Sequence, residues 1–206
     1  MLYDYARAVT DSVNIKFLES VKIKEWKGIG RSKIYLPKEG VDLILYLLNP
    51  LWDVFEIPQI SIGDEQSLNN LKSEHPIINV DSEASFIYGG STSLIILKLN
   101  DENKIDLQNF IHEIVHYCRY YSQILTRNEL EEEMETELIT DLIFKPLKNM
   151  LFRIMKIYDD YLIIKDIEGY IPEYTSIKIY SCYRRPLNSV LKIFFMLLSK
   201  KGDTND

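Results

Sequence analysis

The sequence predicts one α+β domain, because strand-like segments fill its first half and helical patterns fill its second. In residues 1–106, short runs rich in β-branched and aromatic residues alternate with turn residues. In residues 107–206, apolar residues recur every three or four positions. The chain has 206 residues, 46% of them hydrophobic, and no Pro/Gly/Ser-rich linker divides it. We therefore expect a single domain with a sheet-rich part over 1–106 and a helix-rich part over 107–206.

The clearest β element is a hairpin. Residues 84–88 and 92–99 are strand-like runs that meet at Gly89, Gly90 and Ser91, which are residues typical of a tight turn. We expect the sheet to be mixed or antiparallel. Further strands are expected at 13–23, 33–36, 56–62 and 77–80, and helices at 3–10 and 41–48.

The helix that follows the hairpin is the best-defined element of the second half. Asp106 is a suitable N-cap for a helix beginning at Leu107. A second helix is expected after Asn128 and should end near Pro146, because proline breaks a helix interior. A further helix at 147–162, an extended segment at 171–183 and a last helix complete the expected order.

Two of the three histidines lie in the stretch His112-Glu113-Ile114-Val115-His116. On a helix this spacing places both imidazoles on one face, where they can bind a single Zn²⁺. Glu113 would then lie beside the open position of the metal, as a general base does. The apolar stripe of this helix borders both histidines, so we expect them to face a partly buried groove.

A catalytic zinc needs a third protein ligand, and the sequence restricts what it can be. No histidine follows His116 and no cysteine precedes Cys118. Cys118 itself lies two residues after His116 and therefore points away from the metal. A carboxylate remains, and residues 129–141 supply many.

Most of these carboxylates have an ordinary explanation, because glutamates in a first helical turn favour the positive end of the helix dipole. Glu137 and Asp141 lie in mid-helix instead, on the face that also carries Met134. We take that face, which includes Leu130, Leu138 and Leu142, as the inward one. Carboxylates there need a partner or a metal. Glu133 is the chief alternative third ligand.

The motif together with Glu137-Leu138-Ile139-Thr140-Asp141 resembles the gluzincins, the thermolysin-like zinc peptidases. The resemblance covers about 30 residues of motif and implies a zincin-like fold. It implies that His112, His116 and Glu137 bind zinc, that Glu113 is the general base, and that Asp141 is an outer acceptor for a ligating imidazole. It also implies that the strand at residues 92–99 pairs with an extended substrate; an internal strand is the alternative.

Composition limits the partners and the location. The net charge of −7 argues against a nucleic-acid or anionic membrane surface. Residues 190–198 form the most apolar run, which is shorter than the roughly 20 residues that span a bilayer. The first residues lack the layout of a signal peptide, so we expect a cytoplasmic protein. Two cysteines are too few for a disulfide scaffold.

The expected function is that of a zinc metallopeptidase acting on a polypeptide, either broadly or on one dedicated intracellular protein. The alternative is a non-catalytic regulatory protein with a degenerate protease fold that zinc stabilises. Cleavage specificity, an inhibitory pro-segment and oligomeric state stay open. The donor that would stabilise the oxyanion is also open among several residues: Tyr120, Tyr121, Arg127, Tyr180, Tyr183 and Arg184.

Overall fold

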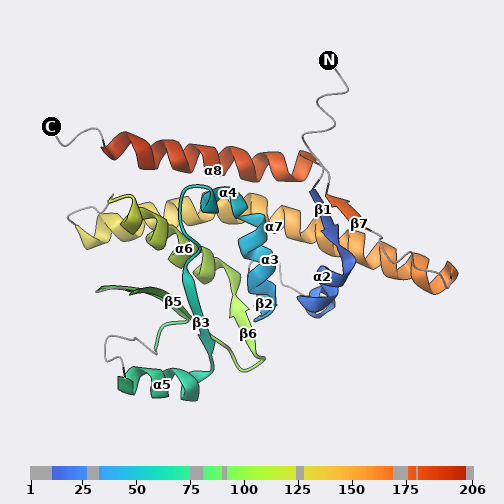
Figure 1. The fold of residues 1–206 in the computed structure, drawn as a ribbon, viewed down its shortest axis with the longest axis horizontal. Helices are drawn as coiled ribbons and strands as arrows, with labels where there is room; N and C mark the ends of the chain where they lie inside the picture. The colour runs from blue at the N-terminus through green and yellow to red at the C-terminus, as the bar shows by residue number, and fades with distance from the viewer. Residues whose placement is uncertain are drawn as a thin grey trace.

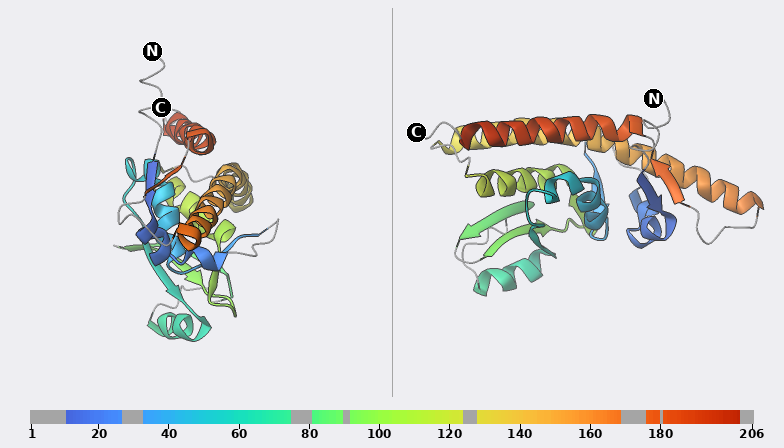
Figure 2. Two further views of the ribbon diagram at one scale, coloured as in Figure 1. Left: turned by 90° about the vertical axis from the view of Figure 1, so that its right-hand side faces the viewer. Right: turned by 45° about the horizontal axis from the view of Figure 1, so that its top comes forward.

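The computed structural model describes residues 11–26, 33–74, 81–89, 92–123, 128–168, 176–179 and 181–202. The elements form layers (Figures 1 and 2). Helix α8 (Ser181–Gly202) runs along α7 (Glu129–Glu168), and α6 (Leu107–Tyr121) lies between α7 and a three-stranded sheet. Helix α5 (Glu65–Glu74) covers the far side of that sheet. The predicted α+β class is confirmed, with helices dominating the second half.

The central strand of the three-stranded sheet is β5 (Thr92–Lys98). It runs parallel to β3 (Gln59–Gly63) and antiparallel to β4 (Ala84–Gly89), so the predicted hairpin is confirmed. Because β5 has a partner on both sides, it has no open edge for a substrate. The expectation that residues 92–99 pair with an extended peptide is therefore wrong. Among the described strands, β4 is the edge strand that packs beside α6.

The composition of β5 explains its central place. Ile95 and Leu97 are fully buried in the main core, whereas Ile96 packs with Leu68 of α5 on the opposite face. A strand buried on both faces is expected to be a continuous apolar run rather than an alternating one. The remaining strands form two separate antiparallel pairs, β1 (Asp11–Asn14) with β7 (Ser176–Ile179) and β2 (Tyr35–Pro37) with β6 (Lys104–Asp106).

The rest of the N-terminal half is more helical than the sequence predicts. Residues 13–23 were expected to form a strand, but β1 is followed by α2 (Ile15–Ser20) and the 3-10 helix η1 (Ile23–Trp26). The expected helix at 41–48 is present as α3 (Gly40–Leu47), with the short α4 (Asn49–Trp52) after it. The expected helix at 3–10 and the strand at 77–80 lie outside the described residues.

Helix α6 begins as its sequence predicts. The Asp106 carboxylate accepts hydrogen bonds from the backbone N–H groups of Gln108 (2.9 Å) and Asn109 (3.4 Å), as an N-cap does. Lys33 lies 3.1 Å from the same carboxylate and balances its charge. The apolar stripe is buried as expected, and Cys118 is buried within it. This burial fixes the rotation of α6 and so the direction in which its histidines point.

Helix α7 continues through Pro146, although the sequence predicts an end there. An interior proline costs a helix about 3 kcal/mol or more. The residues near Pro146 in the sequence include three that are buried in the core: Ile143, Leu147 and Met150. Since each large apolar side chain contributes roughly 1.5–3 kcal/mol on burial, packing outweighs the cost of the proline.

The buried face of α7 is not the one expected. The sequence predicts an inward face that carries Leu130, Met134, Leu138 and Leu142, but these residues are 45–67% exposed. Thr136 and Thr140 are fully buried on the opposite side, together with Ile139, Ile143 and Phe144. Both faces carry apolar residues at helical spacing, and the side with the small threonines is the one that packs against the protein.

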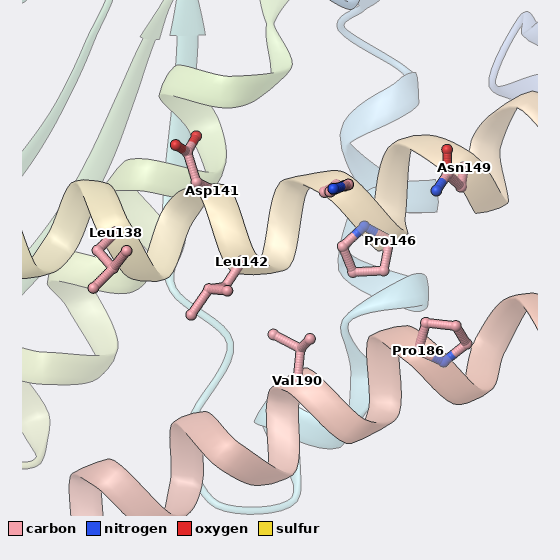
Figure 3. Close-up of a pocket in the computed structure, with 8 residues that line it drawn as sticks. Leu138, Asp141, Leu142, Pro146, Asn149, Pro186 and Val190 are labelled. Carbon is pink, nitrogen blue, oxygen red and sulfur yellow. The ribbon is translucent and has the colours of Figure 1, made fainter.

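Leu138 and Leu142 line a groove of about 430 Å³ between α7 and α8, together with Pro146 and Val190. Asp141 points away from Leu142 and Val190 (Figure 3), on the side of α7 that faces α6. In the part of the chain that the structure describes, no helix combines the length and apolar character needed to cross a membrane.

Candidate metal centre

His112 and His116 lie one turn apart on α6, at the border between its buried stripe and α7. Their Nε2 atoms are 3.0 Å apart, and the two side chains are 18% and 17% exposed. The histidine pair is therefore partly buried, as the sequence predicts, and it lies in the contact between two helices.

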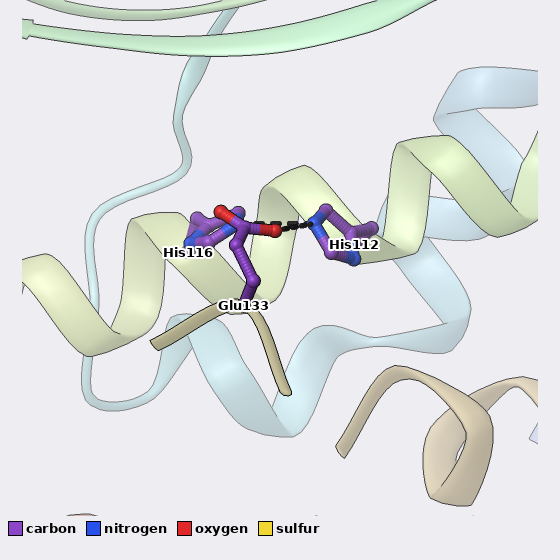
Figure 4. Close-up of side chains that lie close together, drawn as sticks. All are labelled: His112, His116 and Glu133. Carbon is purple, nitrogen blue, oxygen red and sulfur yellow. Dashed lines mark hydrogen bonds and ion pairs between the residues drawn. The ribbon is translucent and has the colours of Figure 1, made fainter. Parts of the chain in front are cut away.

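A carboxylate from α7 meets this pair of nitrogens. Oε2 of Glu133 lies 3.3 Å from Nε2 of His112, and Oε1 lies 3.2 Å from Nε2 of His116 (Figure 4). The approach is possible because the first turns of α7 lie against the face of α6 that carries the histidines. The structure thus brings together two imidazole nitrogens and one carboxylate.

The spacing of these donors fits a zinc ion. Zinc lies 2.0–2.2 Å from nitrogen and oxygen ligands, so two ligands of a tetrahedral site are roughly 3.3 Å apart. The Nε2 atoms are 3.0 Å apart, and each lies 3.2–3.3 Å from a different oxygen of the Glu133 carboxylate, distances close to this value. One set of ligand atoms from His112, His116 and Glu133 lies within 4.8 Å of one another. Two nitrogens and one carboxylate oxygen are a donor set that zinc accepts while keeping a position open.

The other ring nitrogens of both histidines have acceptors nearby. Nδ1 of His112 lies 3.4 Å from Oε2 of Glu137, and Nδ1 of His116 lies 3.5 Å from Oγ1 of Thr136. An imidazole that donates its Nδ1–H in this way directs the Nε2 lone pair outward, as ligating histidines do. Burial and the neighbouring His112 lower the pKa of His116, which favours the neutral ring that binds metal.

Glu137 and Asp141, the two carboxylates that the gluzincin resemblance implies, therefore each lie one helical turn beyond the place on α7 expected for their role. Glu137 occupies the outer position expected of Asp141, and Asp141 accepts a hydrogen bond from Nε2 of Gln108 at 3.2 Å. Glu133, the alternative third ligand, lies where Glu137 was expected. Residues four apart share a helix face, so sequence spacing alone does not determine which of them lies level with the histidines.

Glu113 lies next to His112 in the chain, and its carboxylate accepts a hydrogen bond from the backbone N–H of Phe86 in β4. Burial raises the pKa of Glu113 to about 7, and the charge of Glu133 adds to this rise. The Phe86 hydrogen bond acts in the opposite direction. A carboxylate with a pKa near neutrality is well suited to exchange protons with a bound water.

Arg119 is a part of the site that the sequence did not reveal. It is 2% exposed, and its guanidinium binds both oxygens of Glu132 at 2.7 Å and Glu135 at 2.8 Å. This network joins α6 to the first turns of α7, next to Glu133. A signal was present in the sequence, because Arg119 follows His116 by three residues and interrupts an apolar helix face.

The candidate oxyanion donors are only partly described. Tyr120 and Tyr121 lie in the last turn of α6, so Tyr120 follows His116 by one turn. Arg127 and Tyr180 lie outside the described residues, as do the side chains of Tyr183 and Arg184. The donor therefore stays unassigned.

Comparison of the chain with protein-family models, curated proteins and solved structures gave no match. The gluzincin resemblance rests on the motif residues alone. The function is therefore inferred from the arrangement of His112, His116, Glu133 and Glu113.

Proposed function

We propose that the protein is a zinc-dependent metallopeptidase in which His112, His116 and Glu133 hold the metal and Glu113 is the general base. The observation that supports this most directly is the convergence of both Nε2 atoms on the Glu133 carboxylate, at 3.2–3.3 Å. Relative to the expectation from sequence, Glu133 replaces Glu137 as the third ligand.

Zinc bound at such a site supplies a Lewis acid and lowers the pKa of a bound water toward neutrality. Glu113 would accept the proton of that water as it attacks a peptide carbonyl, and would then deliver it to the leaving amine. The position of Glu113 beside His112 and its raised pKa support both transfers. The Phe86 N–H would hold the carboxylate in place.

The number of donors favours a catalytic over a purely structural metal. Structural zinc sites are usually closed by four protein ligands, whereas catalytic sites use three and leave one position open. Among the described residues, three donors converge here. The competing function is a protein that binds zinc only to join α6 and α7 and cuts no peptide.

The Glu113→Gln variant separates these functions. We expect purified protein to hold one zinc per chain by elemental analysis, and the variant to retain it, because Gln keeps the shape of the side chain. Cleavage of an unfolded protein such as casein should fall by 100-fold or more, since general-base catalysis is worth about 10²–10⁴. Unchanged cleavage in the variant would reject the proposed base.

A zinc-loaded protein that cuts no peptide would favour the structural role. Cleavage of one cellular protein, with casein left intact, would identify a dedicated peptidase.

A further inference from the structure

Helix α7 carries a stripe of apolar side chains that the fold leaves open to solvent. Leu130, Met134, Leu138 and Leu142 recur every four residues and are 45–67% exposed. The spacing places them along one side of α7 over about 18 Å, because each residue advances a helix by about 1.5 Å. A contiguous apolar surface of this kind marks a site of interaction more often than a scattered leucine does.

Helix α8 extends the apolar surface across the groove between the two helices. Val190 and Leu142 line this groove together (Figure 3). Ile193 and Leu197 follow Val190 by one and two turns, so they lie on the same side of α8, and they are 52% and 49% exposed. Because α8 runs antiparallel to α7 (Figures 1 and 2), these residues continue alongside the α7 stripe. We call the stripe with these three α8 residues the α7–α8 face.

The charges along α7 indicate what kind of partner the α7–α8 face fits. Every charged residue in 129–141 is acidic, and every charged residue in 142–157 is basic. A uniformly acidic or basic helix would match only one half of α7. An antiparallel copy of α7 matches both halves, because each acidic half then meets a basic half, whereas a parallel copy would place like charges opposite each other. The helix is therefore complementary to a reversed copy of itself.

A twofold axis near residue 143 suits the apolar side chains as well as the charges. In an interface of this symmetry residue i meets residue j of the second copy, and j meets i. Around position 143, Met134 would lie opposite Phe152 of the second copy, and Asp141 opposite Lys145. Phe152 follows Met134 by five turns on the same side of α7 and is 39% exposed, and both charged residues are exposed. Contacts between methionine and an aromatic ring are favourable.

We propose that the α7–α8 face is the contact surface of a twofold-symmetric dimer, in which the α7 helices of two copies pack antiparallel. From Leu130 to Phe152 the face is about 33 Å long, and at about 10 Å per helix it is about 20 Å wide, which gives about 660 Å² per copy. A standard interface buries about 800 Å² per partner, so the face is close to the size that a specific dimer needs. Interfaces of this size begin at micromolar affinity, and we expect a Kd in that range.

The dimer is independent of the proposed peptidase function. The candidate zinc ligands lie where α7 meets α6, whereas the apolar groove lies where α7 meets α8. Either proposal can therefore fail without the other. At concentrations far below the Kd the chain is monomeric and the face is open to solvent, so unfolding of the dilute protein reports on a single chain.

Sedimentation equilibrium of the full chain tests the dimer. Between about 1 µM and about 200 µM we expect the mass to rise from that of one chain toward that of two. Leu138→Lys should raise the Kd by more than about 100-fold, because it removes a large apolar side chain from the contact twice. Val54→Lys is the matched control: Val54 is 65% exposed but lies after α4, outside the face, so the Kd should not change.

An exchange of charges tests the antiparallel arrangement. At low salt Lys145→Glu should raise the Kd about tenfold, because two like-charged pairs replace two ion pairs. The double variant Asp141→Lys/Lys145→Glu restores opposite charges across the axis and should return the Kd to within about twofold of wild type. Circular dichroism checks that each variant is folded.

Three results would overturn the proposal. A chain that stays monomeric over the whole range has no such dimer, and if it binds phosphatidylcholine vesicles through Leu138 the face belongs to a membrane instead. A dimer that Leu138→Lys leaves intact uses another surface. A dimer that Lys145→Glu weakens but the double variant does not restore lacks the antiparallel pairing of α7.

Discussion

Glu137 contacts His112 at Nδ1, at 3.4 Å, whereas Glu133 contacts the same imidazole at Nε2. In the proposed site, the His112 ring thus lies between Glu133, which would share its metal, and Glu137, which would orient the ring. Outer partners of this kind usually change metal affinity about 10–100-fold, which is less than the loss of a ligand.

This relationship predicts an order of effects on zinc affinity. Glu133→Gln should weaken zinc binding by more than 100-fold, Glu137→Gln by about 10–100-fold, and Asp141→Asn should leave it near the wild-type value. Competition with a chromophoric chelator measures all three, and far-UV circular dichroism checks that each variant is folded. A larger effect of Glu137→Gln would instead support Glu137 as the third ligand, as the gluzincin resemblance implies.

The sequence was sufficient to place the histidine pair but not the carboxylate. The pair lies within one helix, whose N-cap and apolar stripe are local features of residues 106–118. Glu133 reaches it from another helix, and that contact depends on how α7 is rotated and how far it is shifted along α6. The sequence does not determine the rotation, because α7 has apolar residues on two faces, and the threonine-containing face is the buried one.

Contacts between distant segments also account for the other differences between the predicted and the observed fold. Pro146 breaks a helix in isolation, but the burial of Ile143 and Leu147 on either side is a tertiary effect that a local rule does not include. The hairpin of β4 and β5 was predictable from its turn residues, whereas the pairing of β3 with β5 joins segments distant in the chain. Interactions between distant segments therefore account for most of what the sequence did not predict.

The orientation of α7 can be tested by truncating one residue on each face. Leu138 is 63% exposed and Ile143 is 1% exposed. Leu138→Ala should change the free energy of unfolding by less than about 1 kcal/mol, whereas Ile143→Ala should lower it by about 2–5 kcal/mol, because it opens a cavity in the core. Urea unfolding of the two variants measures the difference. A larger loss in Leu138→Ala would mean that the leucine face packs inward.

Arg119 should stabilise the contact between α6 and α7. In Arg119→Met the Glu132 carboxylate, 13% exposed, loses its main partner, and breaking a buried ion pair from one side costs about 3–5 kcal/mol. Adding Glu132→Leu to that variant should recover much of the loss, since an apolar pair of similar volume is often tolerated. Glu135→Gln is the control, with an expected cost below about 1 kcal/mol, because Glu135 is 42% exposed. Equal stability of wild type and Arg119→Met in urea would contradict this role.

The raised pKa of Glu113 predicts how the stability of the metal-free protein depends on pH. Burial raises this pKa from 4.5 to about 7, so the folded state prefers the protonated carboxyl group. The corresponding stability is fully present below about pH 4.5 and is lost as the pH rises through 7, to a total of at most about 3 kcal/mol. In Glu113→Gln the side chain cannot ionise, so the free energy of unfolding in EDTA should fall less between pH 5 and pH 7.5 than in wild type. The exposed Glu131→Gln should behave as wild type does. A parallel pH dependence in wild type and Glu113→Gln would show that the Glu113 carboxyl group is not desolvated in the fold.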